Sequence, residues 1–519
     1  MRKKRISLWI GGVLAVLILL FVIAIPLARE PLRRYVENTM NENLEGYSVE
    51  LGSISYRPIS AVILHDLLIF QDAHPDPPVA DIPYLRASLH WRQILRARLV
   101  ADFKVENPNL HLNLEQLREE MEEEVPADER GWQEAVQAIY PFRVNVITIR
   151  EGELVYIDED PDQPLHLEDI FFEAINIRNI VSPDATYPSS FRLESVIFGE
   201  GRLLVDGNAD FLQEPYPGVD TQVEITGIPL DPIRPVLSRY NIFIRNGEFA
   251  ASGHIEHSPQ VRRYEFDSVE ISDIHLDYRY QGPDPEADEN DTTEAVMEAV
   301  TAGPPGEEEF LYRVENLRVT GIVGIVNTET DPQYRLFLDP FDLRINQLSN
   351  DIRLGTTTAE LSGMFMGSGR TSASAALRPE ETDPEFYLDL TIEETHMPAM
   401  NDLLMAYGGF DVTEGQFSLV MEIRVEDQRV DGYVEPFLKD MTVLDPDEDK
   451  DFAQQFYEGV VDALSILLEN IPRDEVATRA YITGELDDPE VSTWEIVGNL
   501  IRNAFFEAII PRFEEEAEQ

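Results

Sequence analysis

The stretch Phe386-Tyr-Leu-Asp-Leu-Thr-Ile392 carries an apolar side chain at every second position. The same alternation occurs in Phe142-Arg-Val-Asn-Val146 and in Asp220-Thr-Gln-Val-Glu-Ile225. Because successive side chains of a strand point to opposite faces of a sheet, this pattern predicts strands with one apolar and one polar face. The alternation dominates from residue 142 to about residue 445 and predicts a mainly β protein.

The apolar faces of these strands require a cover, and two arrangements supply one. A second sheet can pack on the first at about 10 Å, which gives tandem β-sandwiches. The sheet can also curl around apolar ligands and leave an open groove. Side-chain periodicity is the same in both arrangements, so the alternation alone does not choose between them.

Two parts of the chain resemble each other at a constant spacing. Asn246-Gly-Glu-Phe249 matches Glu414-Gly-Gln-Phe417, and Gly199-Glu-Gly-Arg202 matches Gly367-Ser-Gly-Arg370, both 168 residues apart. A shared offset indicates an internal duplication. We expect a first β repeat over 141–280 and a second over 310–445. The stretch 281–309, with ten acidic residues and no basic one, is predicted to be a linker.

The N-terminus contains an uncharged run from Trp9 to Ala28, which at about 1.5 Å per residue matches a hydrocarbon core of about 30 Å. A cleaved signal peptide is the alternative, but its apolar region is normally about 7–15 residues long. We therefore predict a transmembrane anchor over 9–28, preceded by a cytoplasmic tail over 1–8 because basic residues favour the cytoplasm. The residues chosen to represent this anchor are Trp9, Leu14, Leu17, Leu20, Phe21 and Ala28.

The remaining segments flank the repeats. Residues 29–114 are predicted to form an N-terminal β segment that begins with a helix, in which Leu32, Tyr35, Val36 and Met40 share one face. Residues 115–140 have helical spacing and form an insert. Residues 446–519 are predicted to form a C-terminal helix-strand-helix segment with amphipathic helices.

Composition excludes several functions. The net charge of −57 disfavours binding to nucleic acid or to an anionic membrane surface along the body. The chain has no cysteine, its nine histidines are dispersed, and its acidic clusters near residues 158–169 and 445–451 lack the glycine of an EF-hand loop. No nucleophile elbow, P-loop or dinucleotide motif occurs. We expect no enzyme activity, metal or cofactor.

Several motifs occur in a characteristic order. Leu51-Gly-Ser-Ile-Ser-Tyr56 is followed by Leu85-Arg-Ala-Ser-Leu-His-Trp91, and then by Val105-Glu-Asn-Pro-Asn-Leu-His-Leu-Asn-Leu114. Near the C-terminus stands Thr483-Gly-Glu-Leu-Asp-Asp-Pro489. In these motifs the chain resembles an uncharacterised subfamily of the AsmA-like proteins of bacterial envelopes. It resembles more distantly the TamB-like and chorein-like bridge proteins.

That resemblance implies a single-pass protein of the bacterial inner membrane with a periplasmic body. The body would be an elongated, curled antiparallel sheet with an open hydrophobic groove. The groove would bind or transport phospholipid for maintenance of the outer envelope. The residues chosen as candidates for the groove face are Val144, Val146, Val223, Ile225, Leu388 and Leu390.

A second reading stays open at this point. The protein can be a non-catalytic scaffold whose closed β domains bind other envelope proteins and assist outer-membrane assembly. A continuous apolar trough favours the lipid reading, whereas discrete two-sheet domains favour the scaffold.

Overall fold

The computed structural model describes residues 29–44, 46–57, 61–90, 99–113, 142–157, 164–177, 186–213, 216–280, 310–351, 353, 355–378, 385–426, 429–443 and 480–485. The chain divides into two compact units. Unit 1 is Met1–Val223 with Glu256–Pro259, and unit 2 is Glu224–Ile255 with Gln260–Gln519.

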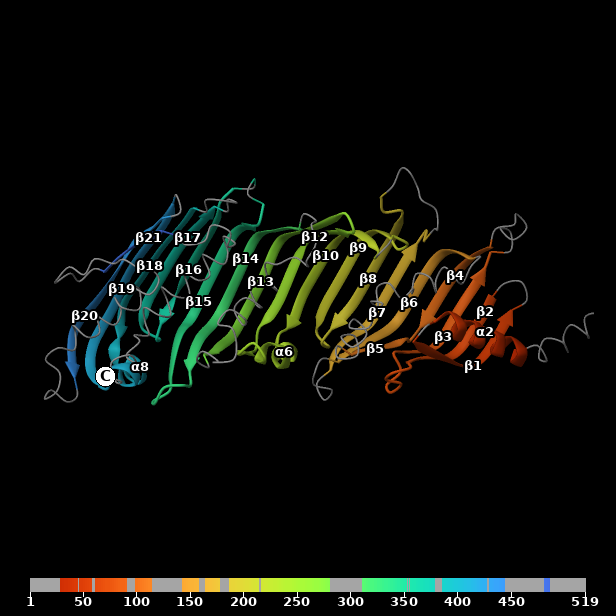
Figure 1. The fold of residues 1–519 in the computed structure, drawn as a ribbon, viewed down its shortest axis with the longest axis horizontal. Coiled ribbons are helices and arrows are strands. Elements are labelled where there is room, and N and C mark those ends of the chain that lie inside the picture. Colours follow the sequence, from red (N-terminus) through yellow and green to blue (C-terminus); the bar gives the residue numbers. More distant parts are fainter. Residues whose placement is uncertain are drawn as a thin grey trace, which may run out of the picture. The chain divides into compact units, whose positions relative to one another are not determined.

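The described residues of unit 1 form one helix and a series of strands (Figure 1). Its elements are α2 (Arg29–Asn43), β1 (Tyr47–Arg57), β2 (Ala61–Gln71), β3 (Ala80–Leu89), β4 (Leu99–Glu106), β5 (Asn109–Asn113), β6 (Phe142–Ile157), β7 (Leu165–Ile175), β8 (Ser189–Ile197) and β9 (Gly201–Asp210). The boundary between the units falls inside β10 (Gly218–Pro229) and β12 (Glu248–Ser258).

Unit 2 contains short helices between long strands. Its elements are η1 (Asp231–Ile233), α6 (Arg234–Ser238), β11 (Ile242–Arg245), β13 (Val261–Tyr280), β14 (Phe310–Asn327), β15 (Tyr334–Ser349), β16 (Thr357–Phe365), β17 (Gly369–Arg378), β18 (Glu385–His396), η3 (Met397–Met400), α8 (Asn401–Gly408), β19 (Val412–Glu426), β20 (Arg429–Val443) and β21 (Ala480–Glu485).

The prediction of a mainly β protein is confirmed. The strands of the described residues belong to one hydrogen-bonded sheet, not to pairs of packed sheets. The sheet is mixed, which the antiparallel prediction missed, because β4 and β5 each pair with β6 in parallel and β13 pairs with β14 in parallel. Parallel neighbours need a connection of a dozen or more residues. The long stretches 114–141 and 281–309 stand at these two junctions.

The order of elements after the first parallel junction recurs after the second. β6 and β14 begin 168 residues apart, as do β8 and β16, and β9 and β17. In both sets a strand leads into a short helix, α6 or α8, before the chain returns to the sheet. The spacing between the two sets of elements is therefore the spacing between the matching sequence motifs.

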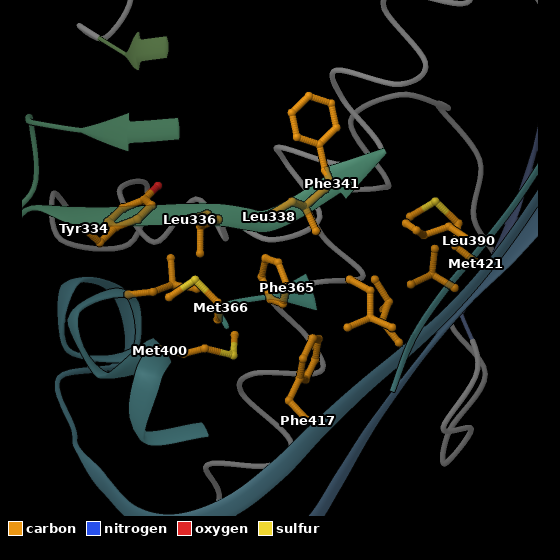
Figure 2. Packing of buried hydrophobic residues seen from close by; sticks show 14 of the residues in the cluster. Tyr334, Leu336, Leu338, Phe341, Phe365, Met366, Leu390, Met400, Phe417 and Met421 are labelled. Carbon is orange, nitrogen blue, oxygen red and sulfur yellow. The ribbon is translucent and has the colours of Figure 1, made fainter. Parts of the chain in front are cut away.

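The core of unit 2 is a closed hydrophobic cluster. Leu336 on β15 and Met421 on β19 are 4% and 1% exposed, and both belong to this cluster. Figure 2 shows Leu336 of β15 on the side of the strand where Met366 and Met400 lie. Although β16, β17 and β18 separate β15 from β19 along the sheet, the two strands share one core.

Helix α8 is held in place at both ends. At its start the Asn401 side chain accepts the Val412 backbone N–H and donates to the Val412 carbonyl, both at 3.0 Å. At its end Gly409 adopts a left-handed conformation with φ of 68° and donates its N–H to the Met405 carbonyl. Glycine adopts this conformation without the penalty of a Cβ.

In unit 1, helix α2 covers the first strands (Figure 1). Leu32, Val36 and Met40 pack on a cluster formed by β1 and β2. Tyr35, expected on the same face, is 69% exposed, because the packing stripe follows positions 32, 36, 40 and 44. An interval of four residues keeps side chains on one side of a helix, whereas Tyr35 is offset from that stripe.

The predicted membrane anchor lies outside the described residues. Trp9, Leu14, Leu17, Leu20, Phe21 and Ala28 precede α2 and stay a prediction from sequence. Among the helices that the structure does describe, none has the length and apolar character needed to cross a bilayer.

Candidate functional site

A continuous apolar row crosses six strands of unit 1. Backbone pairing between antiparallel or parallel neighbours places paired residues on the same face of a sheet. The pairings from β3 to β9 connect one apolar residue on each strand into what we call the central row. Its members are Leu85, Val105, Ile149, Phe172, Leu193 and Val205.

A second row on the same face runs beside the central row. It connects Ala87, Phe103, Ile147, Ala174, Phe191 and Gly207 on the same six strands. The rings of Phe172, Phe191 and Phe211 lie 5.9–6.2 Å apart between centroids. We call the surface that carries these two rows the apolar face of unit 1.

The side chains on this face are more exposed to solvent than the side chains in the core of unit 2. All six residues of the central row are half-buried. Leu85 also packs on the cluster under α2, but the other five belong to neither buried cluster that the described residues form. By contrast Leu390, on β18 in unit 2, is 3% exposed. An apolar surface left half-exposed on this scale is a candidate binding surface.

The opposite face of the same strands is charged. The row directly behind the central row connects Arg86, Lys104, Thr148, Glu173, Arg192 and Asp206. Arg192 lies 2.6 Å from Glu194 and 3.5 Å from Asp206. The two faces of one stretch of sheet therefore differ in chemistry, and the apolar face suits apolar ligands better.

The structure separates the six residues predicted for the groove face. Val144 pairs with Ala101, whereas Val146 pairs with Asp102 and with the exposed Ile175 on the charged face. A register shift near Asn145 causes this, because one extra residue reverses the alternation. Val144 and Val146 therefore lie on opposite faces of the sheet.

The other four candidates fall into different environments. Val223 is buried in unit 1, and Ile225 is half-buried in unit 2. Leu388 and Leu390 belong to the closed core of unit 2, which leaves Leu390 inaccessible. Sequence reasoning missed the central row, although its alternation is visible in Phe191, Leu193 and in Leu203, Val205.

Ionisable side chains of the described residues do not form a metal centre. No group of three potential metal ligands comes together in the part of the chain with described coordinates. His254 lies 4.0 Å from Glu265, while the ring of His257 lies against Tyr216. These contacts are ordinary ion-pair and ring contacts.

Comparison with known proteins brings no relative to this chain: no family model matches it, and no curated protein matches it.

Proposed function

We propose that this protein binds phospholipid through the apolar face of unit 1. The observation that carries the proposal is the central row, six apolar residues on six neighbouring strands, all half-buried and backed by a charged face. Acyl chains on this face would remove apolar surface from water, at about 0.8 kcal/mol for each buried CH₂ group.

The dimensions of the row suit a lipid chain. Six strands at a spacing of about 4.8 Å give a row about 24 Å long. One leaflet of a bilayer contributes about half of a hydrocarbon core of about 30 Å. The row therefore exceeds the length of one acyl chain.

The cellular setting of the proposal comes from the sequence. The uncharged run 9–28 would hold the protein in an inner membrane, and the helix α2 begins directly after it. A body on the periplasmic side, with its sheet curled into an open groove, would take phospholipid from that membrane. It would then serve maintenance of the outer envelope.

Photo-crosslinking in the full-length, membrane-embedded protein tests this proposal. A photoreactive amino acid replaces Leu193 on the apolar face, and in a separate variant it replaces Arg192 on the charged face of the same strand. Because the two positions are adjacent, they share strand, depth and expression level. We expect phosphorus-labelled lipid to be attached at position 193 at least about tenfold more than at position 192.

Equal labelling at the two positions would contradict the proposal, as would the absence of lipid from position 193 under conditions in which a probe within 9–28 is labelled. The same comparison at Phe172 and Glu173 repeats the test on β7 with the two faces again adjacent.

One observation favours a second function, a scaffold for protein partners. Within the described residues β21 pairs with β20 only from Arg429 to Val434. Beyond that point Phe437 is 43% exposed on β20. A partner strand that adds to this edge would be captured by a photoreactive residue at position 437 as a protein adduct, whereas a lipid-only function gives none there.

A further inference from the structure

Two arginines of unit 2 contact a single carboxylate, Asp277, and a third, Arg279, stands two residues further along the same strand on the same face. Asp277 on β13 has a side chain that is 12% exposed. Arg335 on β15 donates its Nε to Asp277 Oδ1 at 2.8 Å, and Arg245 on β11 donates its Nη2 to Asp277 Oδ2 at 3.1 Å. Gly324 on β14 makes the arrangement possible, because a Cβ there would lie 2.5 Å from Asp277 Oδ1.

The ring of His275 lies against both guanidinium groups. Nη2 of Arg245 and Nη2 of Arg335 lie 3.0 Å and 3.2 Å from the same atom, Nε2 of His275. The same Nε2 lies 3.6 Å from Asp277 Oδ2, so the imidazole stands between the two guanidinium groups and the carboxylate. Two positive groups are thus held together with one negative group between them.

Arg279 adds a third positive charge. Its Cζ lies 3.7 Å from the ring centroid of Phe243, and the Cζ of Arg335 lies 4.9 Å from the ring centroid of Phe337. A guanidinium stacked on a ring keeps its N–H groups directed outward in its own plane. Arg279, Arg245 and Arg335 outnumber Asp277 by two charges, in a chain whose net charge is −57.

The parallel junction of the sheet does not require arginine at the positions of Arg279 and Arg335. In unit 2 the pairing row Arg279–Val326–Arg335 crosses the parallel junction of β13, β14 and β15. In unit 1 the corresponding row of β5, β6 and β7 is His111–Val155–His166, and the junction forms there without arginine. A requirement of the sheet therefore does not explain the charge.

We propose that Arg245, Arg279 and Arg335 form a binding site for a phosphate group. Phosphate offers several acceptor oxygens and a charge of about −2 at neutral pH, which matches in-plane arginine donors and the excess of two positive charges. Asp277 and His275 act as positioning residues that fix the two guanidinium groups. The site lies in unit 2 and is independent of the apolar face of unit 1.

Phosphate binding to the full-length protein in detergent tests the site. Inorganic phosphate is titrated by calorimetry, and in a second arm vesicles of phosphatidylcholine with phosphatidic acid are compared with phosphatidylcholine alone. We expect Arg279→Gln to weaken binding at least about fivefold in the arm that responds. This variant leaves every contact of Asp277 in place, so it separates binding from folding. Arg192→Gln, which removes an exposed charge in unit 1, should change binding less than twofold.

The two arms identify the source of the phosphate. Binding of inorganic phosphate alone assigns a small free anion, and Arg279-dependent binding only to vesicles with phosphatidic acid assigns a lipid headgroup. The proposal is overturned if neither arm shows saturable binding. It is also overturned if Arg279→Gln and Arg245→Gln leave binding unchanged while Arg192→Gln weakens it. The lipid crosslinking expected at Leu193 does not depend on the outcome of this phosphate test, so the two proposals can fail separately.

Discussion

At the scale of single residues, each of two asparagine side chains hydrogen-bonds both backbone groups of one strand residue. Asn41 of α2 bonds both the N–H and the carbonyl of Val49 on β1, and Asn401 of α8 does the same for Val412 on β19. A side-chain amide carries one acceptor and donors, so it can replace a neighbouring strand at one residue. On β1, which pairs with β2, this covers part of the edge that faces away from β2.

Replacement of Asn401 tests the strength of this pairing. Asn401→Ala leaves the two backbone groups of Val412 unpaired beside a side chain that is 1% exposed. We expect the free energy of unfolding to fall by about 1–3 kcal/mol, measured by urea denaturation. Asp402→Ala, at the exposed neighbouring position of α8, should change it by about 0.5 kcal/mol or less. Equal effects of the two variants would show that the amide pairing contributes nothing specific.

Tyr312 on β14 gives a prediction for alkaline pH. Burial raises the pKa of Tyr312 to about 12. A raised pKa means that the folded state favours the neutral phenol, so its stabilising contribution is complete below the unfolded pKa of about 10 and is lost as the pH rises toward 12. The difference in tyrosinate absorbance between the wild type and Tyr312→Phe should therefore titrate near pH 12. Titration of that difference near pH 10 would contradict the burial of this side chain.

At the scale of elements, bulges decide which residues of a strand reach the core. In β18 the residue Glu394 has a φ of 56°, and the pairing with β19 shifts between Ile392 and Thr395. Ile392 and Thr395, on either side of this shift, are both fully buried. Strict alternation after Ile392 would instead have placed Glu394 on the core side. The shift near Asn145 acts in the same way on β6 and moves Val146 to the charged face.

Truncation of matched leucines distinguishes a closed core from an open face. Leu419→Ala on β19 removes a side chain that is 3% exposed in the core of unit 2 and should lower the free energy of unfolding by about 2–5 kcal/mol. Leu193→Ala removes the same atoms from the half-buried apolar face of unit 1. There we expect about 1 kcal/mol or less, because less apolar surface is lost.

Chemical denaturation of each variant, followed by fluorescence, measures both values. A loss at Leu193 as large as the loss at Leu419 would mean that the apolar face is already packed, which would leave no room for a lipid chain.

At the scale of the whole molecule, the excess of acidic residues gives a prediction for stability. With 98 acidic and 41 basic residues, the chain repels itself at neutral pH. Salt shortens the range of that repulsion from about 10 Å at 0.1 M to about 3 Å at 1 M. We expect the thermal midpoint at pH 7 to rise as sodium chloride increases over this range.

The matching control uses pH. Near the isoelectric point of about 4.3 the net charge is close to zero, so salt should have little effect on the midpoint there. An equal rise at both pH values would attribute the effect to general salt stabilisation of apolar burial and not to charge repulsion.

The local sequence sufficed for the mainly β class of fold, but not for the face of every residue, because bulges reverse the alternation. Alternation in stretches such as Phe386–Ile392 predicts strands, because the side-chain period of two is a property of the backbone. The shared offset of 168 residues also appears in the spacing of β8 and β16. Only the tertiary structure decided which apolar residues are accessible.

Leu390 and Leu193 have the same pattern around them, yet one lies in a closed core and the other on a half-exposed face. Their difference depends on what packs above each strand, and distant segments such as β15 and α8 supply that cover. Arg245 and Arg335 likewise come from different strands and reach Asp277 on a third strand only through long-range pairing. Periodicity is encoded locally, whereas burial and convergence depend on contacts between residues far apart in the chain.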